Sequence, residues 1–276
     1  RALPEWMDWY ATAAIHSEFF LKAMAAYTEP YDVLPNGVYR EDEYLQAPPE
    51  RRESFRQQVL NGIPLGNGYR LRIFPVWFDF RGHFGTLLAN TKSLSTTALL
   101  RRDPALLRLA ETQLGWIVGR NPFAQSTMFG EGCDYPLLYS AMSGNLVGAL
   151  PVGIQTKGDR DVPYWPASNY PNWKEVWVHP AGHWLSILAD MAQGIRPPAP
   201  GRDFQLSVYP ASNGALEIRV AGKNLGNRRF TIRPENLILS GAAPLWRGRP
   251  KDAGKPWVAV VIPDGDTTQA RDVTGH

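Results

Sequence analysis

The sequence is poor in the residues that several common kinds of site require. Cys133 is the single cysteine among 276 residues, which excludes an intramolecular disulfide and a cysteine-rich metal site. The chain contains no run of about 18 or more apolar residues, so no segment is predicted to span a membrane. Neither a Gly-x-Ser-x-Gly motif nor a Gly-x-x-x-x-Gly-Lys loop occurs. Serine-nucleophile hydrolases and P-loop enzymes are therefore not indicated.

Charge of one sign is also lacking. The 29 Lys and Arg residues are interspersed with 26 Asp and Glu residues, which leaves a net charge of +3 without a long basic block. No nucleic-acid-binding motif accompanies them, so a nucleic-acid partner is not predicted. The sequence begins with Arg1 and shows no signal peptide, a start that we interpret as a processed or cut end.

Aromatic residues are abundant instead. The 10 Trp and 11 Tyr side chains are typical of a well-filled core, but flat aromatic rings also stack on the apolar faces of pyranose sugars. Each aromatic cluster therefore has two interpretations, packing or carbohydrate binding.

Apolar residues recur at spacings of three and four over much of the chain. They predict a helix within residues 4–27, a second that continues through Leu100, and a third that begins after the N-cap Asp103 and ends at Gly119. The short turn between the last two predicts a helical hairpin. Such hairpins, with long loops on one side, predict part of a helical toroid with its site at one rim.

The pattern changes after a Pro-rich linker at residues 197–201. Apolar residues then alternate with polar ones, and Asn213-Gly214 between two such runs predicts a β-hairpin. We expect residues 202–276 to form a small antiparallel β-sandwich with a packing role, and residues 1–196 to form the catalytic part. The predicted fold class is mainly α plus β, a partial toroid of helical hairpins followed by the sandwich.

A long irregular span, residues 124–170, separates the hairpin from the last helix. Segments of this length inside a compact domain are usually functional. Its aromatic pair, Tyr164 and Trp165, is a candidate sugar-binding platform. Asp159 and Asp161 are candidate calcium ligands, although two carboxylates are few for an ion that takes about six to eight oxygens.

Three polar residues alternate with aromatic ones before the hairpin, namely Asp79, Arg81 and His83. They form either the polar edge of a binding cleft or an ion pair that fixes a loop. All three are candidate substrate-binding residues.

The densest group of reactive side chains lies at residues 172–185, with one carboxylate, two histidines and three tryptophans. A carboxyl group among apolar rings keeps its proton more readily than one in water, as the general acid of glycoside cleavage must. Glu175 is the candidate acid. The alternative is a structural glutamate paired with Lys174 or a nearby arginine. The candidate substrate-binding residues of this region are Tyr170, Trp173, Trp177, His179 and His183.

Two histidines four residues apart can bind zinc from one face of a helix. Pro180 lies between His179 and His183, so we expect zinc ligation from one helix face to be compromised there, and we place Pro180 in the first turn of the last helix. No convincing third ligand accompanies them. Neither a metal ion nor another cofactor is predicted.

One part of the chain resembles a known family. Residues 113–126, QLGWIVGRNPFAQS, followed by Gly130-Glu131-Gly132, look like a hallmark of glycoside hydrolase family 9. In that family a helix ends in a Leu-Gly-Arg-Asn-Pro-type turn before a Gly-rich loop. Residues 144–150, GNLVGAL, and a glutamate before the last helix follow in the same order. The resemblance covers residues from about 70 to 193.

The resemblance implies an (α/α)6 toroid that hydrolyses a poly- or oligosaccharide with inversion, in the periplasm or outside the cell. It places Glu175 at the family's general acid. Lys174 departs from the family, whose members usually have Asn there, and residues 133–136 lack the His-His-Arg cluster that members often carry. These departures point away from cellulose and towards a decorated or acidic glycan.

The family's catalytic base belongs to an Asp-rich motif in the first half of its domain, and this chain has no counterpart. We therefore expect the chain to be the C-terminal half of such a domain. An N-terminal portion or a second chain would complete the toroid and supply the base.

Two other classes of function remain open. A polysaccharide lyase or another uronate-processing enzyme also combines a helical toroid with a β-domain. Tyr170, His179 or His183 would then remove a proton, while Asn172 or Arg160 would neutralise the uronate. A non-catalytic glycan-binding protein would use the aromatic side chains alone.

Overall fold

The computed structural model describes residues 3–75, 82–139, 146–165, 171–197 and 203–276. The chain groups into two compact units. The β-rich unit comprises Arg1–Lys22, Thr96–Leu106 and Gln193–His276, and the helical unit comprises Ala23–Ser95 and Leu107–Ala192. This grouping differs from the predicted division at residues 197–201, because the N-terminal helix belongs with the strands.

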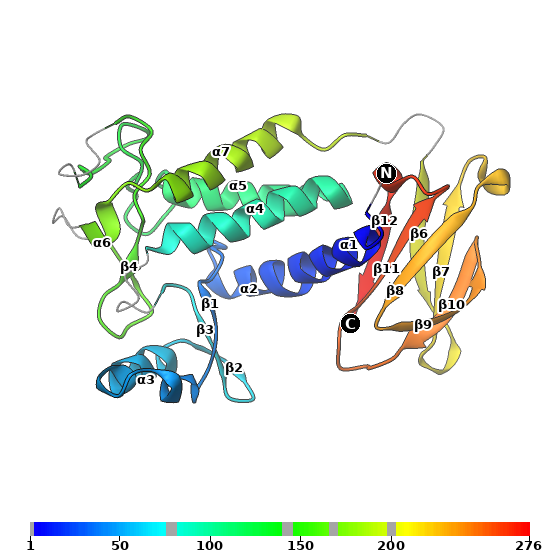
Figure 1. Ribbon diagram of the computed structural model, residues 1–276, viewed down its shortest axis with the longest axis horizontal. Coiled ribbons are helices and arrows are strands. Elements are labelled where there is room, and N and C mark those ends of the chain that lie inside the picture. Colours follow the sequence, from blue (N-terminus) through cyan, green and yellow to red (C-terminus); the bar gives the residue numbers. More distant parts are fainter. Residues whose placement is uncertain (1–2, 76–81, 140–145, 166–170, 198–202) are drawn as a thin grey trace. The chain divides into compact units, whose positions relative to one another are not determined.

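The β-rich unit is an antiparallel sandwich (Figure 1). Its strands are β6 (Phe204–Pro210), β7 (Leu216–Gly222), β8 (Phe230–Glu235), β9 (Leu237–Ala242), β10 (Leu245–Pro250), β11 (Trp257–Pro263) and β12 (Arg271–Gly275). One sheet has the order β6-β7-β10-β9 and the other β12-β11-β8. The predicted hairpin is present, since β6 pairs with β7 and the turn residues Asn213 and Gly214 both have positive φ.

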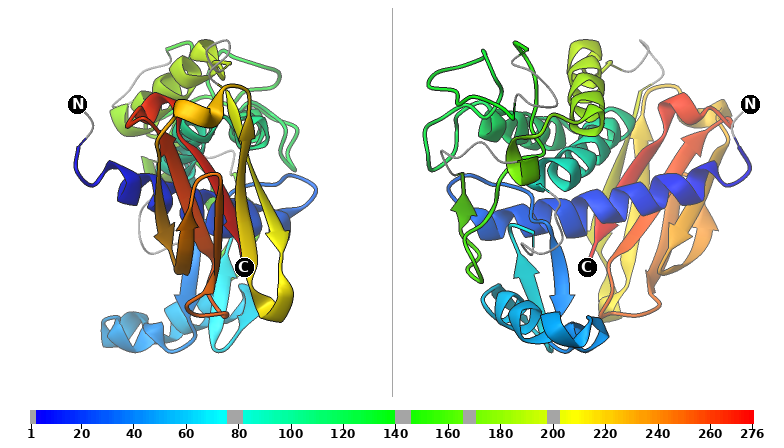
Figure 2. Two further views of the ribbon diagram at one scale, coloured as in Figure 1. Left: turned by 90° about the vertical axis from the view of Figure 1, so that its right-hand side faces the viewer. Right: turned by 60° about the vertical axis from the view of Figure 1, so that its left-hand side comes forward.

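Strand β11 is buried along its whole length. Successive side chains of a strand point to opposite faces, so one set enters the sandwich core and the other packs against a helix. The core set is Trp257, Ala259 and Val261. The outer set, Val258, Val260 and Ile262, packs on Tyr10, Ala11 and Ala14 of α1 (Trp6–Ile15). Figure 2 shows α1 crossing this sheet.

Helix α1 continues into a π-helical turn, η1 (His16–Lys22). A buried charge network ties it to the sheet. The Tyr10 hydroxyl donates to Asp272 at 2.8 Å, and Arg101 at the end of α4 (His83–Arg101) pairs with Asp272 at 2.9 Å and with Glu18 at 3.2 Å. These contacts place the N-terminal helix in the β-rich unit.

The helical unit carries the remaining elements. Its helices are α2 (Ala23–Ala25), α3 (Arg52–Leu60), α6 (Pro171–Lys174), α7 (Val178–Gln193) and most of α4 and α5 (Pro104–Ile117). Its strands are β1 (Gly37–Arg40), β2 (Ile63–Gly66), β3 (Tyr69–Arg72), β4 (Gln155–Thr156) and β5 (Pro163–Tyr164). The antiparallel sheet β1-β3-β2 was not predicted, because strands this short show little alternation.

Helices α4 and α5 form the predicted hairpin, and Asp103 caps α5 by accepting from the backbone N–H of Ala105 at 2.8 Å. Helix α7 lies beside α4 and runs in the same direction (Figure 1). The Lys92 ammonium of α4 donates to Asp190 of α7 at 2.6 Å and to the Ser186 carbonyl at 3.4 Å. The predicted fold class, α plus β with helical hairpins and an antiparallel sandwich, is confirmed. None of the described helices is both long and apolar enough to cross a membrane.

Candidate functional site

A buried segment, residues 150–154, supports the loop that carries Glu175. The Val152 N–H donates to the Glu175 carbonyl at 2.8 Å, and the Val152 carbonyl accepts from the Phe84 N–H at 3.1 Å. A Cβ at Gly82 would lie 1.9 Å from that carbonyl oxygen, so only glycine permits this approach. The backbone of Glu175 is thereby tied, through Val152, to the start of α4.

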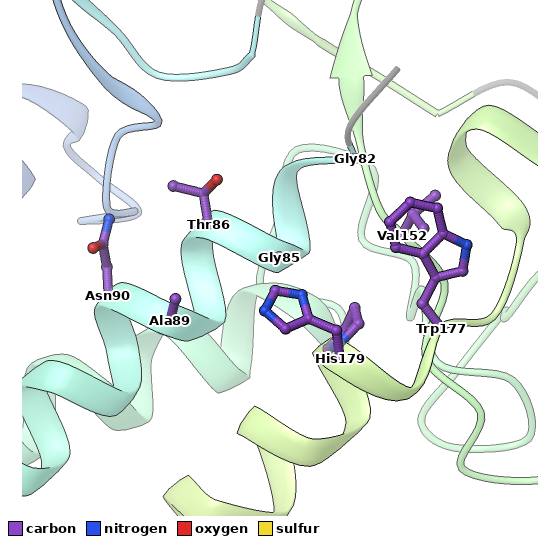
Figure 3. Close-up of a pocket in the computed structure, with 9 residues that line it drawn as sticks. Gly82, Gly85, Thr86, Ala89, Asn90, Val152, Trp177 and His179 are labelled. Carbon is purple, nitrogen blue, oxygen red and sulfur yellow. The ribbon is translucent and has the colours of Figure 1, made fainter. Parts of the chain in front are cut away.

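The Glu175 carboxyl group is half-buried and held by a neighbouring indole. Trp177 Nε1 donates to Glu175 Oε2 at 2.7 Å, and 42% of the Trp177 residue is exposed. Trp177 also lines a cavity of about 390 Å³ between the start of α7 and α4. Figure 3 shows Thr86, Ala89 and Asn90 along α4, with the His179 ring near this helix and the Trp177 ring next to Val152. The full lining is Gly82, Gly85, Thr86, Ala89, Asn90, Val152, Trp177, His179 and Pro180.

The sequence did not single out the α4 side of this cavity. Gly82 and Gly85 are three residues apart at the start of a helix, a spacing that lets another element approach closely. That spacing was the available signal. Thr86 and Asn90 carry no motif and are identified by position alone.

His179 and His183 meet on one face of α7. Their Nε2 atoms are 3.1 Å apart, with ring centroids 4.7 Å apart. Pro180 does not disturb the helical spacing, and its predicted place in the first turn of the last helix agrees with the structure. Pro180 lies in the first turn of α7, where its missing N–H has no intrahelical partner to lose, so the helix continues normally.

The other predicted aromatic residues that the structure describes in this region are Tyr164, Trp165 and Trp173. Trp173 packs edge-on against Tyr164 at 6.2 Å between ring centroids, and the Lys174 ammonium lies 5.5 Å from the centroid of Trp165. Lys174 is only 2% exposed, and this burial lowers its pKa. Trp165 thus contacts a buried cation. None of these three aromatic residues lines the cavity beside Trp177.

His83 is completely buried, with its ring 5.1 Å from that of Phe74. Within the described residues, neither ring nitrogen has a hydrogen-bond partner in bonding geometry. Burial lowers the pKa of His83 to about 4, which the nearby Leu34 backbone offsets only in part. In this structure His83 is therefore a packing residue with no surface for a substrate. Asp79, Arg81 and Tyr170 lie outside the described residues.

This buried imidazole predicts sensitivity to acid. The unfolded chain binds a proton at the ordinary pKa of 6.5 and the folded chain only near 4, so stability falls as pH decreases through that window. The loss amounts to about 3 kcal/mol. We expect His83→Phe to flatten the dependence of unfolding free energy on pH between these values, as measured by urea titrations. The same substitution at half-buried His16 serves as the control, and equal slopes for wild type and His83→Phe would contradict the assignment.

Asp161 is bound by protein groups. Its carboxylate accepts from the backbone N–H groups of Ile73 at 2.8 Å and Phe74 at 3.0 Å, and Arg72 Nε lies 3.7 Å from Oδ1. Burial raises the pKa of Asp161 and lowers that of Arg72, so desolvation outweighs attraction for both partners. Asp159 is exposed. No group of three or more His, Cys, Asp or Glu side chains in the described residues is placed to hold a metal ion, so calcium stays a hypothesis.

No protein-family model and no curated protein matches the chain. Among solved structures, it is similar to endoglucanase CelQ from Clostridium thermocellum complexed with cellobiose and cellotriose. The identity is 17% and the TM-score 0.36, over 81% of this chain and 48% of that chain. For CelQ complexed with cellotriose the identity is 17% and the TM-score 0.37, over 84% of this chain and 50% of that chain. The chain spans about half the length of these structures, and at this distance the likeness assigns no role to any residue.

Proposed function

We propose that the protein is a glycoside hydrolase that acts on a poly- or oligosaccharide with inversion, with Glu175 as the general acid. The observation that carries the proposal is the Glu175–Trp177 hydrogen bond of 2.7 Å beside a cavity that Trp177 lines. It presents an oriented carboxyl group and an exposed aromatic face at one place. The resemblance of residues 113–126 and 144–150 to glycoside hydrolase family 9 supports the same assignment.

The hydrogen bond determines which oxygen can deliver a proton. An indole N–H is a donor only, so Oε2 of Glu175 must accept. A protonated Glu175 therefore carries its proton on Oε1. In glycoside cleavage this proton passes to the leaving oxygen while the bond to the anomeric carbon breaks. Trp177 is thus a positioning residue for the acid and a stacking surface for the sugar.

An inverting mechanism needs a second carboxylate about 6.5–9.5 Å from the acid to activate water. The cavity lining contains no Asp or Glu among the described residues. We propose that the base comes from an N-terminal portion of the same protein or from a second chain that completes the toroid. The same resemblance supports a periplasmic or secreted location. The reaction needs no cofactor.

The test is product chemistry on a panel of soluble β-glucans, xylans and uronate-containing glycans, with the native protein. A hydrolase releases new reducing ends without an ultraviolet-absorbing product, and NMR of the first product shows inverted anomeric configuration. A product that absorbs in the ultraviolet identifies a lyase, in which His179 or His183 would remove the proton. Turnover of no glycan in the panel, or retained configuration, overturns the proposal.

A glycan-binding protein is the second candidate, because the cavity offers an exposed indole and no carboxylate among its described lining residues. Binding and catalysis separate in a calorimetric titration. Tight binding of an oligosaccharide by native protein that never turns it over favours this candidate.

The indole N–H of Trp177 can be removed while the ring is kept. We expect Trp177→Phe to lower kcat/KM by up to about tenfold, since a hydrogen bond to a neutral carboxylic acid contributes about 0.5–1.5 kcal/mol. The loss should fall mainly on kcat, because the phenyl ring still stacks on sugar. Trp9→Phe, at a residue 61% exposed on α1, is the matched control. A change confined to KM would show that Trp177 binds the sugar without orienting Glu175.

A further inference from the structure

The histidine pair on α7 adds a component that the proposed acid does not need. His179 lines the cavity, whereas His183 does not. His183 contacts His179 through the Nε2–Nε2 distance of 3.1 Å, with the two rings inclined at 75°. A hydrogen bond between two imidazole nitrogens requires one to donate and the other to accept, so at least one of the two rings must be neutral.

The position of His179 is fixed on its other side by α4. A Cβ placed on Gly85 would lie 3.5 Å from both Cε1 and Nδ1 of His179. The Nδ1 edge of the ring therefore faces Gly85, which also lines the cavity. With Nε2 engaged by His183, Nδ1 is the nitrogen available to a ligand. Because one proton is shared between Nε2 and Nδ1 in a neutral ring, the bond to His183 also determines whether Nδ1 donates or accepts.

The surroundings of His183 disfavour its protonated form. The groups that face His183 are His179 on its own helix and Lys92 on α4, and burial and these two neighbours lower the pKa of His183. Lys92 pairs with Asp190 at 2.6 Å, and Asp190 also accepts from the Ser95 hydroxyl at 2.7 Å.

We propose that His183 is a positioning residue that holds His179 in one orientation and one dominant tautomer, so that Nδ1 of His179 meets a sugar hydroxyl in the cavity. We call this fixing of the His179 tautomer by His183 the tautomer lock. The contact with sugar rests on the proposed function, but the tautomer lock does not. The lock is present while at least one imidazole is neutral and is lost as pH falls and both rings become protonated, because two N–H groups would then point at each other.

The test compares His183→Ala with His183→Gln, whose amide reaches the place of Nε2 and keeps a hydrogen-bonding group there. Long-range ¹H–¹⁵N correlation spectra of the imidazoles report the tautomer of His179 without any substrate. We expect one dominant tautomer in the wild type and in His183→Gln, and a mixture in His183→Ala. His16→Gln, in the other unit, is the matched control.

Activity supplies the second readout. We expect His183→Ala to lower kcat/KM about tenfold with a shifted acidic limb of the pH profile, and His183→Gln to restore most of it. Mixed tautomers of His179 in the wild type, or an unchanged tautomer in His183→Ala, would overturn the lock. If the lock holds while no glycan is turned over, the proposed function fails and the positioning role stands.

Discussion

Replacing Glu175 with glutamine is expected to lower kcat by about 10²–10⁴ on the glycan that the native protein hydrolyses. Glutamine has the shape of glutamate, and its carbonyl oxygen still accepts the Trp177 N–H that now bonds Oε2 at 2.7 Å. It cannot release a proton to the leaving oxygen. Sugar binding, measured by calorimetry, should stay within about threefold because the cavity is unchanged.

The leaving group provides a sharper criterion. The dinitrophenolate group of a dinitrophenyl glycoside departs without protonation. Glu175→Gln should therefore affect cleavage of this substrate far less than cleavage of the natural glycan. Glu111→Gln, an exposed position on α5, is the matched control and should leave both rates unchanged. Equal losses on both substrates would assign Glu175 a structural role. Wild-type turnover of the natural glycan by Glu175→Gln would remove it from the mechanism.

Asp161→Asn is expected to lower the free energy of unfolding by about 3–5 kcal/mol, the usual effect of breaking a buried ion pair on one side. Arg72 has no exposed side-chain area, and a guanidinium cannot neutralise itself by losing a proton. The substitution therefore leaves a buried cation without its counter-charge. Asp161 accepts hydrogen bonds from two backbone N–H groups, and one of them loses its oxygen acceptor because asparagine has a single side-chain oxygen.

Removing the other partner of the ion pair should lower the free energy of unfolding by less. In Arg72→Met the carboxyl group keeps the N–H groups of Ile73 and Phe74 and can take up a proton, as burial already raises its pKa. Urea unfolding of both variants measures the difference. Asp159→Asn, two residues away and exposed, is the matched control and should change stability by no more than about 0.5 kcal/mol. A cost for Asp161→Asn no greater than this control would show that the pair is not energetically coupled.

Local features of the fold were predictable because their causes are local. Asp103 caps α5 through its own side chain, and Asn213-Gly214 turns between paired strands because both residues adopt positive φ. The apolar character of residues 257–262 predicted a strand but not its two partners. The continuous apolar run only shows that both faces are buried, and the sequence contains no information on α1 as the second cover.

The candidate site divides in the same way. The chemistry of Glu175, Trp177, His179 and His183 could be predicted from their side-chain types and close spacing. Their mutual geometry could not. Pro180 was expected in the first turn of the last helix, but only the structure shows that the Nε2 atoms of His179 and His183 lie 3.1 Å apart. His83 was expected near substrate, and burial against Phe74 gives it a packing role instead.

By itself the sequence determined the α4–α5 hairpin, the β6–β7 hairpin and the strand character of the C-terminal part, and which stretch concentrates a carboxyl group with indole and imidazole rings. Only the tertiary structure decided that residues 150–154 join the Glu175 loop to α4, and that Trp177 both binds Glu175 and lines a cavity. The reason is physical. Caps, turns and periodicity depend on neighbours a few residues away, whereas burial, approach distances and hydrogen-bond partners depend on segments that are distant in the chain and meet only when it folds.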